Sequence, residues 1–313
     1  MDESIQEIKN QIQKLKKERN AVILAHYYVP GEVQDIADFV GDSYYLSKIA
    51  ASAKEDVILF CGVHFMGESA KLLSPDKTVL MPDLTADCPM AHMTTAADIK
   101  KIREEHPEAA VVCYINSTAE IKAHSDVCVT SSNALQVVKN LPNREIYFIP
   151  DRHLGSYVAG LIPEKVFLFN EGFCPIHQQI TRKDVEKAKA LHPHAKVAAH
   201  PECDQEVLAL ADYIGSTSGI IDYATSSGGE ELIVCTETGV FHEIWKKAGH
   251  KRLIAPRADQ ICPDMKKNTL MKVLEALIHM EPEVELPESI REEALRPLER
   301  MLQLAQEGSH EKQ

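Results

Sequence analysis

The hydrophobic and polar positions along the chain repeat one pattern three times. Each repeat opens with a charged segment whose apolar residues recur at three-to-four spacing, which predicts an amphipathic helix. A short apolar run follows, ends in polar or ring-bearing residues, and has the length of a buried strand. The helical segments are 4–18, 95–106 and 182–192, and the apolar runs are 20–28, 108–116 and 194–202.

Two further features complete each repeat. A cluster of small residues opens a second predicted helix, in the segments 40–50, 129–139 and 214–224. An apolar strand follows at 55–63, 144–152 and 230–238, then a third predicted helix, and then another apolar strand within 77–89, 164–175 and 250–263. Apolar strands that alternate with helices favour a parallel sheet covered by helices on both faces.

These repeats predict an α/β fold of three similar three-layer α/β/α domains with parallel sheets. We place the domains at 1–93, 94–179 and 180–313, and the last range also holds C-terminal helices and a frayed end. Ligands of open α/β sheets bind at the carboxyl ends of the strands. A pseudo-threefold arrangement would therefore direct three sets of strand ends toward one centre.

Composition and charge limit the possible functions. The net charge of −13 argues against a nucleic-acid partner, and an anionic substrate would need a local positive site. No apolar run approaches the roughly 18 residues of a membrane span. The first 20 residues are charged throughout and lack the apolar core of a signal peptide. We expect a cytoplasmic protein with no membrane and no nucleic-acid partner.

Each repeat ends in a Cys-Pro pair, at Cys88, Cys174 and Cys262, whereas composition alone predicts roughly 0.4 such pairs. Proline suits the first position of a helix, so each cysteine is expected at a helix N-cap, where the helix dipole would lower the thiol pKa. Three converging thiolates suit an iron–sulfur cluster or a three-cysteine zinc site. The alternative is three buried structural cysteines, which is the role we assign to the other five: Cys61, Cys113, Cys128, Cys203 and Cys235.

The first strand of each repeat ends in two polar or ring-bearing residues, two positions apart. The pairs are His26 and Tyr28, Tyr114 and Asn116, and His200 and Glu202. Residues two apart on a strand share a face, so each pair would face a ligand and Tyr27 would point away. A structural role explains any one pair, but polarity kept in all three repeats favours function. Glu202 is the candidate general base, since a carboxylate beside a metal and a histidine can be tuned for that task.

The small-residue clusters place a hydroxyl at the start of each second helix, at Ser43, Ser131 and Thr217. Such residues are ordinary N-caps. Because a helix N-terminus also binds carboxylate or phosphate, the same hydroxyls could receive an anionic substrate. Ser218 and Ser132 are secondary candidates for this role. The chain contains no glycine-rich nucleotide-binding loop.

Taken together, these segments resemble the quinolinate synthase family. The resemblance runs from ILAHYY through GDSYYLS, DCPMA, YINS, TSSNA, FCPIH, AHPEC and GSTSGI to CPDMKKNTL. It implies three stacked domains around a central 4Fe–4S cluster, held by Cys88, Cys174 and Cys262 with one open iron that serves as a Lewis acid. It also implies condensation of iminoaspartate with dihydroxyacetone phosphate to quinolinate, phosphate and water.

The resemblance also implies roles for the strand-end residues. His26 would contact substrate, and Tyr28 would help proton transfer during isomerisation. Tyr114, Asn116 and His200 would hydrogen-bond the substrate beside Glu202, and Tyr28, Tyr114, His200 and Glu202 form the catalytic set. The family implies delivery of iminoaspartate by an aspartate oxidase or dehydrogenase. Some relatives carry Cys-x-x-Cys-x-x-Cys at the third cysteine. Here Cys262 stands alone, so we expect no redox switch based on that run.

Two other functional classes are compatible with three cysteines. An iron–sulfur electron carrier would need a shielded cluster, normally with four cysteine ligands, and no substrate pocket. A zinc-dependent hydratase would use three thiolates on a single ion. A radical enzyme that uses adenosylmethionine is disfavoured, because its close-set cysteine triplet is absent.

Overall fold

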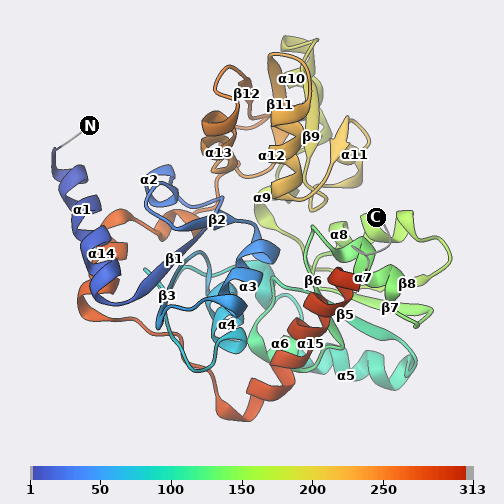
Figure 1. Cartoon of the computed structure of the whole chain (residues 1–313). Coiled ribbons are helices and arrows are strands. Elements are labelled where there is room, and N and C mark those ends of the chain that lie inside the picture. Colours follow the sequence, from blue (N-terminus) through green and yellow to red (C-terminus); the bar gives the residue numbers. More distant parts are fainter. Residues whose placement is uncertain (1–2, 308–313) are drawn as a thin grey trace.

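A computed structural model of the chain describes residues 3–307 and contains three four-stranded sheets, all parallel. Figure 1 shows the sheets in three lobes, with the lobe of β9, β11 and β12 standing above the other two. The predicted α/β class and the three parallel sheets are confirmed. The three sheets lie within residues 21–80, 110–169 and 196–254. The domain boundaries at 93/94 and 179/180 stay a prediction.

The three sheets share one strand order, in which the first strand lies between the second and the third. The first sheet has the order β2-β1-β3-β4, with β1 (Ala21–His26), β2 (Phe39–Gly41), β3 (Val57–Cys61) and β4 (Thr78–Leu80). The second has the order β6-β5-β7-β8, with β5 (Ala110–Tyr114), β6 (Val127–Val129), β7 (Glu145–Ile149) and β8 (Val166–Phe169). The third has the order β10-β9-β11-β12, with β9 (Lys196–Ala199), β10 (Tyr213–Ile214), β11 (Glu231–Cys235) and β12 (Arg252–Ile254).

Helices connect the strands of each repeat. The first repeat contains α1 (Glu3–Glu18), α2 (Gly31–Gln34), α3 (Ser43–Ser52), α4 (His64–Leu73) and the 3-10 helix η1 (Pro89–His92). The second contains α5 (Ala96–Glu105), α6 (Ala119–Ala123), α7 (Ala134–Asn140), α8 (Arg152–Leu161) and α9 (Pro175–Gln178). The third contains α10 (Arg182–Leu191), α11 (Gln205–Leu208), α12 (Thr217–Ser226), α13 (Val240–Lys247) and the 3-10 helix η2 (Met265–Lys267). The chain then continues through α14 (Leu270–His279) and α15 (Glu288–Glu307).

The structure adds one short strand and one short helix to the pattern read from each repeat. The added strands β2, β6 and β10 have two or three residues each, and the added helices α2, α6 and α11 have four or five. Segments this short complete neither a helical turn pattern nor an alternation. The three-residue strands β4 and β12 were predicted because they lie within the longer segments that end in Cys-Pro. The longer helices α5 and α10 agree with the prediction, and each begins with a capping box.

Strand pairing confirms the internal repeat residue by residue. On the first strands, Ala25, Cys113 and Ala199 pair with the last residue of the third strand of their own sheet. His26, Tyr114 and His200 therefore occupy equivalent places at the carboxyl ends of β1, β5 and β9. Two residues farther on, Tyr28, Asn116 and Glu202 are equivalent as well.

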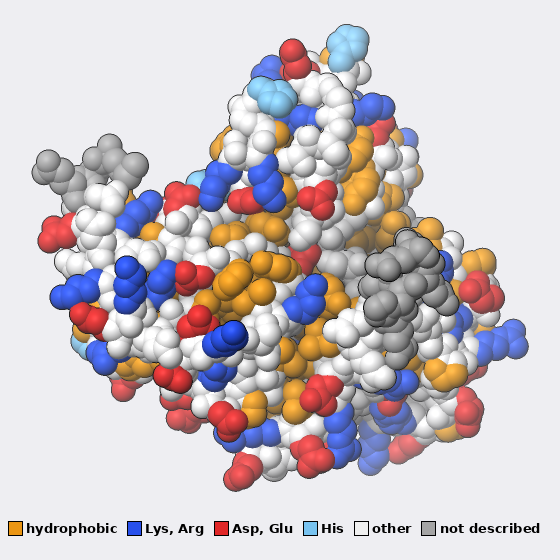
Figure 2. Space-filling model, in the orientation of Figure 1, with side chains coloured by type: hydrophobic (Ala, Val, Ile, Leu, Met, Phe, Trp, Pro, Cys, Tyr) orange, Lys and Arg blue, Asp and Glu red, His pale blue; other side chains and the backbone are white. Residues whose placement is uncertain are grey.

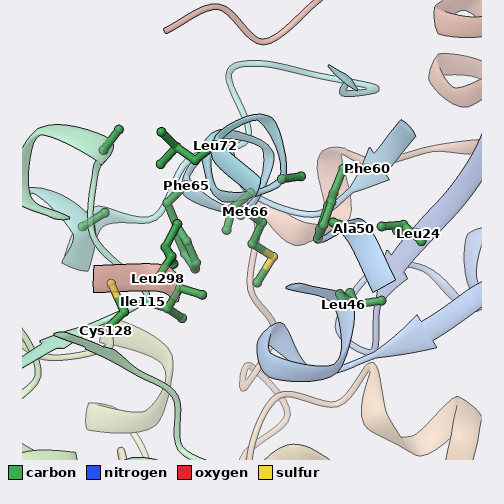
Figure 3. Close-up of a cluster of buried hydrophobic side chains, with 14 of the residues drawn as sticks. Leu24, Leu46, Ala50, Phe60, Phe65, Met66, Leu72, Ile115, Cys128 and Leu298 are labelled. Carbon is green, nitrogen blue, oxygen red and sulfur yellow. The ribbon is translucent and has the colours of Figure 1, made fainter. Parts of the chain in front are cut away.

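One continuous core joins the first two repeats, whereas the third has two cores of its own. Figure 3 shows how α4 spans this core, with Met66 toward Leu46 and Phe60 on one side and Phe65 toward Ile115 on the other. Leu298 of α15 packs into the same core near Phe65. The first two repeats and the C-terminal helix are thus held together by burial of apolar surface.

The C-terminal helices return to the first two repeats although they follow the third. Helix α14 packs against α1, and α15 packs against α6, β6 and α4 (Figure 1). Within residues 3–307, no helix has the combination of length and hydropathy that a membrane crossing requires. Figure 2 shows basic and acidic side chains interspersed on the visible face. The frayed end expected for 308–313 lies outside the described residues.

Candidate active site

A cavity of about 140 Å³ lies where the carboxyl ends of the three sheets meet. Its walls contain nearly all the residues singled out from the sequence. They are His26, Tyr28, Ser43, Cys88, Tyr114, Asn116, Ser131, Cys174, His200, Glu202, Thr217 and Cys262. Ser218 does not line the cavity, and its hydroxyl donates instead to Asp42 at 2.7 Å. Every repeat thus contributes a cysteine, a strand-end pair and a hydroxyl to the same cavity.

The three Cys-Pro pairs lie at turns, but only two of the cysteines cap a helix. Cys88 is the N-cap of η1 and Cys174 is the N-cap of α9, each with proline at the first helical position. The N-cap prediction is wrong for Cys262, because η2 begins at Met265 and its N-cap is Asp264. Pro263 and Asp264 place a turn between this cysteine and the helix.

The prediction that the helix dipole lowers the thiol pKa values is also wrong for the protein without a bound group. Burial raises the pKa of Cys262 to about 11 and holds the pKa values of Cys88 and Cys174 well above the usual range. Nearby charge adds to this, from Cys262 on Cys88 and from Glu202 on Cys174. The helices that follow these cysteines have only three or four residues, and helices this short supply too little dipole to offset the loss of solvation. These thiols become thiolates only when a positive partner compensates.

The three cysteines do not meet at the spacing that a single zinc ion requires. Among residues 3–307, the one group of three Cys, His, Asp or Glu donor atoms that all lie within 4.8 Å of one another is Cys174, His177 and Glu202. The three cysteine sulfurs are therefore not gathered to the spacing of about 3.8 Å that tetrahedral Zn–S bonds of about 2.3 Å require. The three thiols nevertheless line the same cavity.

The group of Cys174, His177 and Glu202 is a hydrogen-bonded pair beside a cysteine. His177 Nδ1 lies 2.7 Å from Glu202 Oε2 and 3.2 Å from Cys174 Sγ. Burial alone would raise the pKa of Glu202, but electrostatic interactions with the His177 and His200 rings and hydrogen bonds from His177 and Tyr114 lower it. Since a carboxylate only accepts, Nδ1 of His177 carries the shared proton.

A chain of hydrogen bonds, which we call the Tyr28 chain, runs from this pair to the first and third repeats. His177 Nε2 lies 2.9 Å from Thr236 Oγ1, and Thr236 Oγ1 lies 2.7 Å from the hydroxyl of Tyr28. The Tyr28 hydroxyl also lies 2.9 Å from Thr217 Oγ1. Because Nδ1 of His177 donates to Glu202, Nε2 accepts from Thr236, which can in turn accept from Tyr28. The chain therefore gives the Tyr28 proton a path to His177.

His26 and His200 make the same hydrogen bond to the backbone in their two repeats. Nδ1 of each ring accepts the N–H two residues on, at 3.2 Å from Tyr28 and 3.3 Å from Glu202. Burial lowers the pKa of His26 to about 4 and that of His200 to about 3, so both rings are neutral near pH 7. In His200 the Nε2–H then donates to Ser131 Oγ at 3.1 Å.

The remaining predicted residues present polar atoms to the cavity. Asn116 Oδ1 is buried and has no hydrogen-bond partner, which leaves it available to a ligand. Burial and the charge of Glu202 raise the pKa of Tyr114 well above its usual value, so its phenol stays protonated. Ser43 and Thr217 are the first residues of α3 and α12, as predicted, and Ser131 precedes α7. Tyr27 is absent from the cavity wall and packs in the third-repeat core.

Several residues of the site were missed in the sequence. His177 and Thr236 carry the Tyr28 chain, and the signal for His177 was its place three residues after Cys174. Asp151 and Glu237 occupy equivalent positions two residues after β7 and β11. Glu237 accepts the backbone N–H of Cys262 at 3.1 Å and pairs with Lys266 at 2.8 Å. An alignment of the third strands would have shown both carboxylates together.

The other five cysteines are buried and unpaired by disulfides, as predicted. They are Cys61, Cys113, Cys128, Cys203 and Cys235, each enclosed in a core.

Comparison with known proteins identifies relatives over nearly the whole chain. A family model described as Quinolinate synthetase A protein matches residues 10–303. A protein named quinolinate synthase from Caldicellulosiruptor bescii is 51% identical over 301 residues, which cover 96% of this chain and 99% of that protein. Proteins of the same name from Clostridioides difficile and Fusobacterium nucleatum are 50% and 52% identical over 296 and 299 residues. Each match covers 95% of this chain, and 97% and 99% of the respective relative.

Proposed function

Because the chain belongs to the quinolinate synthetase A protein family, we propose that it is a quinolinate synthase. In this proposal it condenses iminoaspartate with dihydroxyacetone phosphate to quinolinate, phosphate and water, as a step of NAD biosynthesis. One observation carries the proposal: three cysteines from three equivalent repeats line one cavity together with the strand-end residues. The names and identities of the relatives support the same reading.

Cys88, Cys174 and Cys262 would hold a 4Fe–4S cluster. Such a cluster with three protein ligands leaves one iron open, and that iron supplies Lewis-acid chemistry to substrate oxygens. The cluster also supplies the positive partner that the buried thiols need. The donor spacing supports a cluster over a single zinc ion, which disfavours a zinc-dependent hydratase.

The hydroxyls of Ser43, Ser131 and Thr217 would receive the carboxylate and phosphate groups of the substrates. Ser43 and Thr217 begin helices of ten residues, whose first N–H groups favour anions. This arrangement provides the local positive potential that a chain of net charge −13 lacks elsewhere. Asn116, with its free Oδ1, would accept a hydrogen bond from a substrate N–H or hydroxyl group.

Tyr28 would move the protons of the isomerisation step. The condensation product carries a ketone that must become an aldehyde before the ring nitrogen can close on it. That shift removes a proton from the hydroxymethyl carbon and returns one to the neighbouring carbon. Tyr28 can exchange its proton with His177 through Thr236, while Glu202 stabilises the imidazolium that forms.

The cavity makes an electron carrier the weaker alternative. A carrier needs a shielded, fully ligated cluster close to the surface. Here three cysteines rather than four line a chamber that also holds two neutral histidines and a hydrogen-bonded acid–base chain. We also place the enzyme in the cytoplasm. Because iminoaspartate hydrolyses in water, we propose that an aspartate oxidase or dehydrogenase supplies it directly.

Anaerobic purification followed by a quinolinate assay tests the proposal. The protein should contain iron and sulfide and should form quinolinate from iminoaspartate generated in the assay and dihydroxyacetone phosphate. Cluster-free protein is the control and should form none. Iron-loaded protein that forms no quinolinate would refute the proposed function. Cluster-free protein with full turnover would refute the Lewis-acid role.

A further inference from the structure

Asp42 lies at the junction of all three repeats on the wall of the cavity. It is the N-cap of α3, and its Oδ1 accepts the backbone N–H of Tyr45 at 3.0 Å. Its other oxygen, Oδ2, accepts two hydroxyls from the other repeats, those of Ser132 and Ser218, each at 2.7 Å. We call these four residues the Asp42 cluster. The Asp42 side chain is 6% exposed, so its contacts are shielded from water.

Asp42 and the two serines that donate to it are each adjacent in sequence to a candidate substrate hydroxyl. Ser43 follows Asp42, Ser131 precedes Ser132, and Thr217 precedes Ser218. Strand pairing makes Ser43, Ser131 and Thr217 equivalent, since Gly41 and Val129 pair with equivalent residues of β1 and β5. One carboxylate therefore fixes three neighbouring hydroxyls that come from three different repeats.

We propose that Asp42 is a positioning residue that sets the spacing of the substrate-binding hydroxyls Ser43, Ser131 and Thr217. The inference rests on the proposed function and extends it to a residue that does not itself contact the reacting atoms. Asp42 accepts hydrogen bonds from the hydroxyls of Ser132 and Ser218. Substrate binding is therefore left to the neighbouring hydroxyls of Ser131 and Thr217. Ser218 thus acts through Asp42 instead of touching substrate, in line with its place outside the cavity wall.

The chemistry of a carboxylate suits this position. Asp42 accepts three hydrogen bonds through two oxygens and donates none, so both hydroxyls must turn toward it. An asparagine would bring an N–H group toward one of them. The equivalent residues of the other repeats are Thr130 and Ser216, and Ser216 caps α12 without reaching another repeat. The first repeat alone therefore supplies the residue that ties the three together.

Substitution by serine separates the two roles of Asp42. Asp42→Ser keeps a good N-cap for α3, as Ser216 does for α12, but removes the oxygen that reaches Ser132 and Ser218. Asp42→Ala removes the cap as well. Thr95→Ala is the matched control, because Thr95 caps α5 through a capping box far from the cavity wall. Ser132→Ala and Ser218→Ala, singly and together, remove the hydroxyls that donate to Asp42 and leave Asp42 itself unchanged.

The test measures quinolinate binding to each anaerobically loaded protein, from the shift that quinolinate causes in the cluster spectrum. Both Asp42 variants should load the cluster, and their dissociation constants should rise about tenfold or more, because two hydrogen bonds to a charged group are lost. Thr95→Ala should lower thermal stability without changing the dissociation constant. Adding Ser132→Ala to Asp42→Ala should weaken binding no further, since the shared contact is already gone.

If Asp42→Ser binds quinolinate with the dissociation constant of the unmodified protein, the positioning role of Asp42 is overturned. If the Asp42 variants fail to load the cluster, the double variant of Ser132→Ala and Ser218→Ala decides, and wild-type binding there overturns the inference. Failure of the proposed function looks different, because the unmodified chain itself would then show no spectral shift with quinolinate.

Discussion

Tyr28 combines a high pKa with a route for its proton, and this combination is the main chemical feature at the residue scale. Burial and the charge of Glu202 raise its pKa well above the usual value, so the phenol is neutral at rest. Thr236 and His177 provide the acceptors that let it lose a proton for the duration of a step. The buried tyrosine is thereby a weak acid with a base at hydrogen-bond distance through one hydroxyl.

Tyr28→Phe removes the first member of the Tyr28 chain and should lower turnover about 10²- to 10⁴-fold, the usual contribution of general acid–base catalysis. The absorption spectrum of the cluster should stay unchanged, because no cysteine is disturbed. Tyr147→Phe is the control: Tyr147 is also buried, in β7, but lies outside the cavity wall. Equal turnover of Tyr28→Phe and the unmodified enzyme would remove Tyr28 from the mechanism.

Thr236 allows a finer test of the same chain. Thr236→Val keeps the shape of the side chain but breaks the link between His177 and Tyr28, so turnover should fall about tenfold or more. Thr236→Ser keeps the hydroxyl and should restore most of the rate. If valine and serine behave alike in a steady-state assay, the proton does not pass through this residue.

His26 should make the folded state less stable in mild acid. Its folded pKa of about 4 lies below the unfolded value of 6.5. The unfolded chain therefore binds more protons between these values, and stability present above pH 6.5 is lost as pH falls toward 4. At pH 5 the loss is about 2 kcal/mol.

Denaturant unfolding between pH 7.5 and 5 measures this effect. His26→Asn, whose amide oxygen can replace Nδ1 as acceptor, should flatten the decline of the unfolding free energy. The exposed His250 offers the control His250→Asn, which should leave the decline as it is. An unchanged decline in His26→Asn would show that His26 takes up its proton in the folded state.

At the element scale, the loop after β11 holds the site through close backbone contact. A Cβ on Gly239 would lie 2.7 Å from the Cα of Tyr28 and 2.8 Å from the carbonyl oxygen of Tyr27. Such distances force the loop and the end of β1 apart. Only glycine lets the first and third repeats approach this closely beside the Tyr28 chain.

Gly239→Ala should lower the unfolding free energy by about 1–3 kcal/mol and should also reduce turnover, because Tyr28 must shift. Gly160→Ala, in α8, is the matched control, since a Cβ there meets no atom within 4 Å. That change should be neutral or stabilising by up to about 1 kcal/mol. Thermal unfolding and the quinolinate assay together check the pair, and an active, stable Gly239→Ala protein would contradict the contact.

The elements also show what could be predicted from the sequence and why. Periodicity gave the long strands and helices, and the even spacing of the Cys-Pro pairs gave the repeat that strand pairing confirms. The short strands β2, β6 and β10 carry too few residues for any period. The thiol pKa values went wrong because burial, which depends on all three repeats, outweighs a local helix terminus.

Long-range contacts were also beyond the sequence. His177 and Thr236 come from different repeats and meet only in the folded chain, so no local motif announces them. The third predicted domain was expected to include the C-terminal helices, but one of them, α14, packs against α1 of the first repeat. Sequence periodicity says that a helix has an apolar face, and it does not say which neighbour covers that face.

At the scale of the whole molecule, the site exists only where three repeats meet. A shared core fixes the first two repeats to each other, and the third, with separate cores, completes the cavity with His200, Glu202, Thr217 and Cys262. Polar contacts such as those of Asp42 and the Tyr28 chain cross the boundary between them. The proposed function therefore depends on how the three repeats of one chain pack together, more than on any single repeat.

The most direct test of this account is the iron and sulfide content of the anaerobically purified protein and of three variants. The unmodified chain should hold about four iron and four sulfide ions, and Cys88→Ser, Cys174→Ser and Cys262→Ser should each lose them together with activity. Cys235→Ser, which changes a buried cysteine outside the cavity, should keep both. A cluster that survives intact with full activity in any of the three variants, or one zinc ion per chain without iron, would contradict the convergence of the three repeats on one cluster.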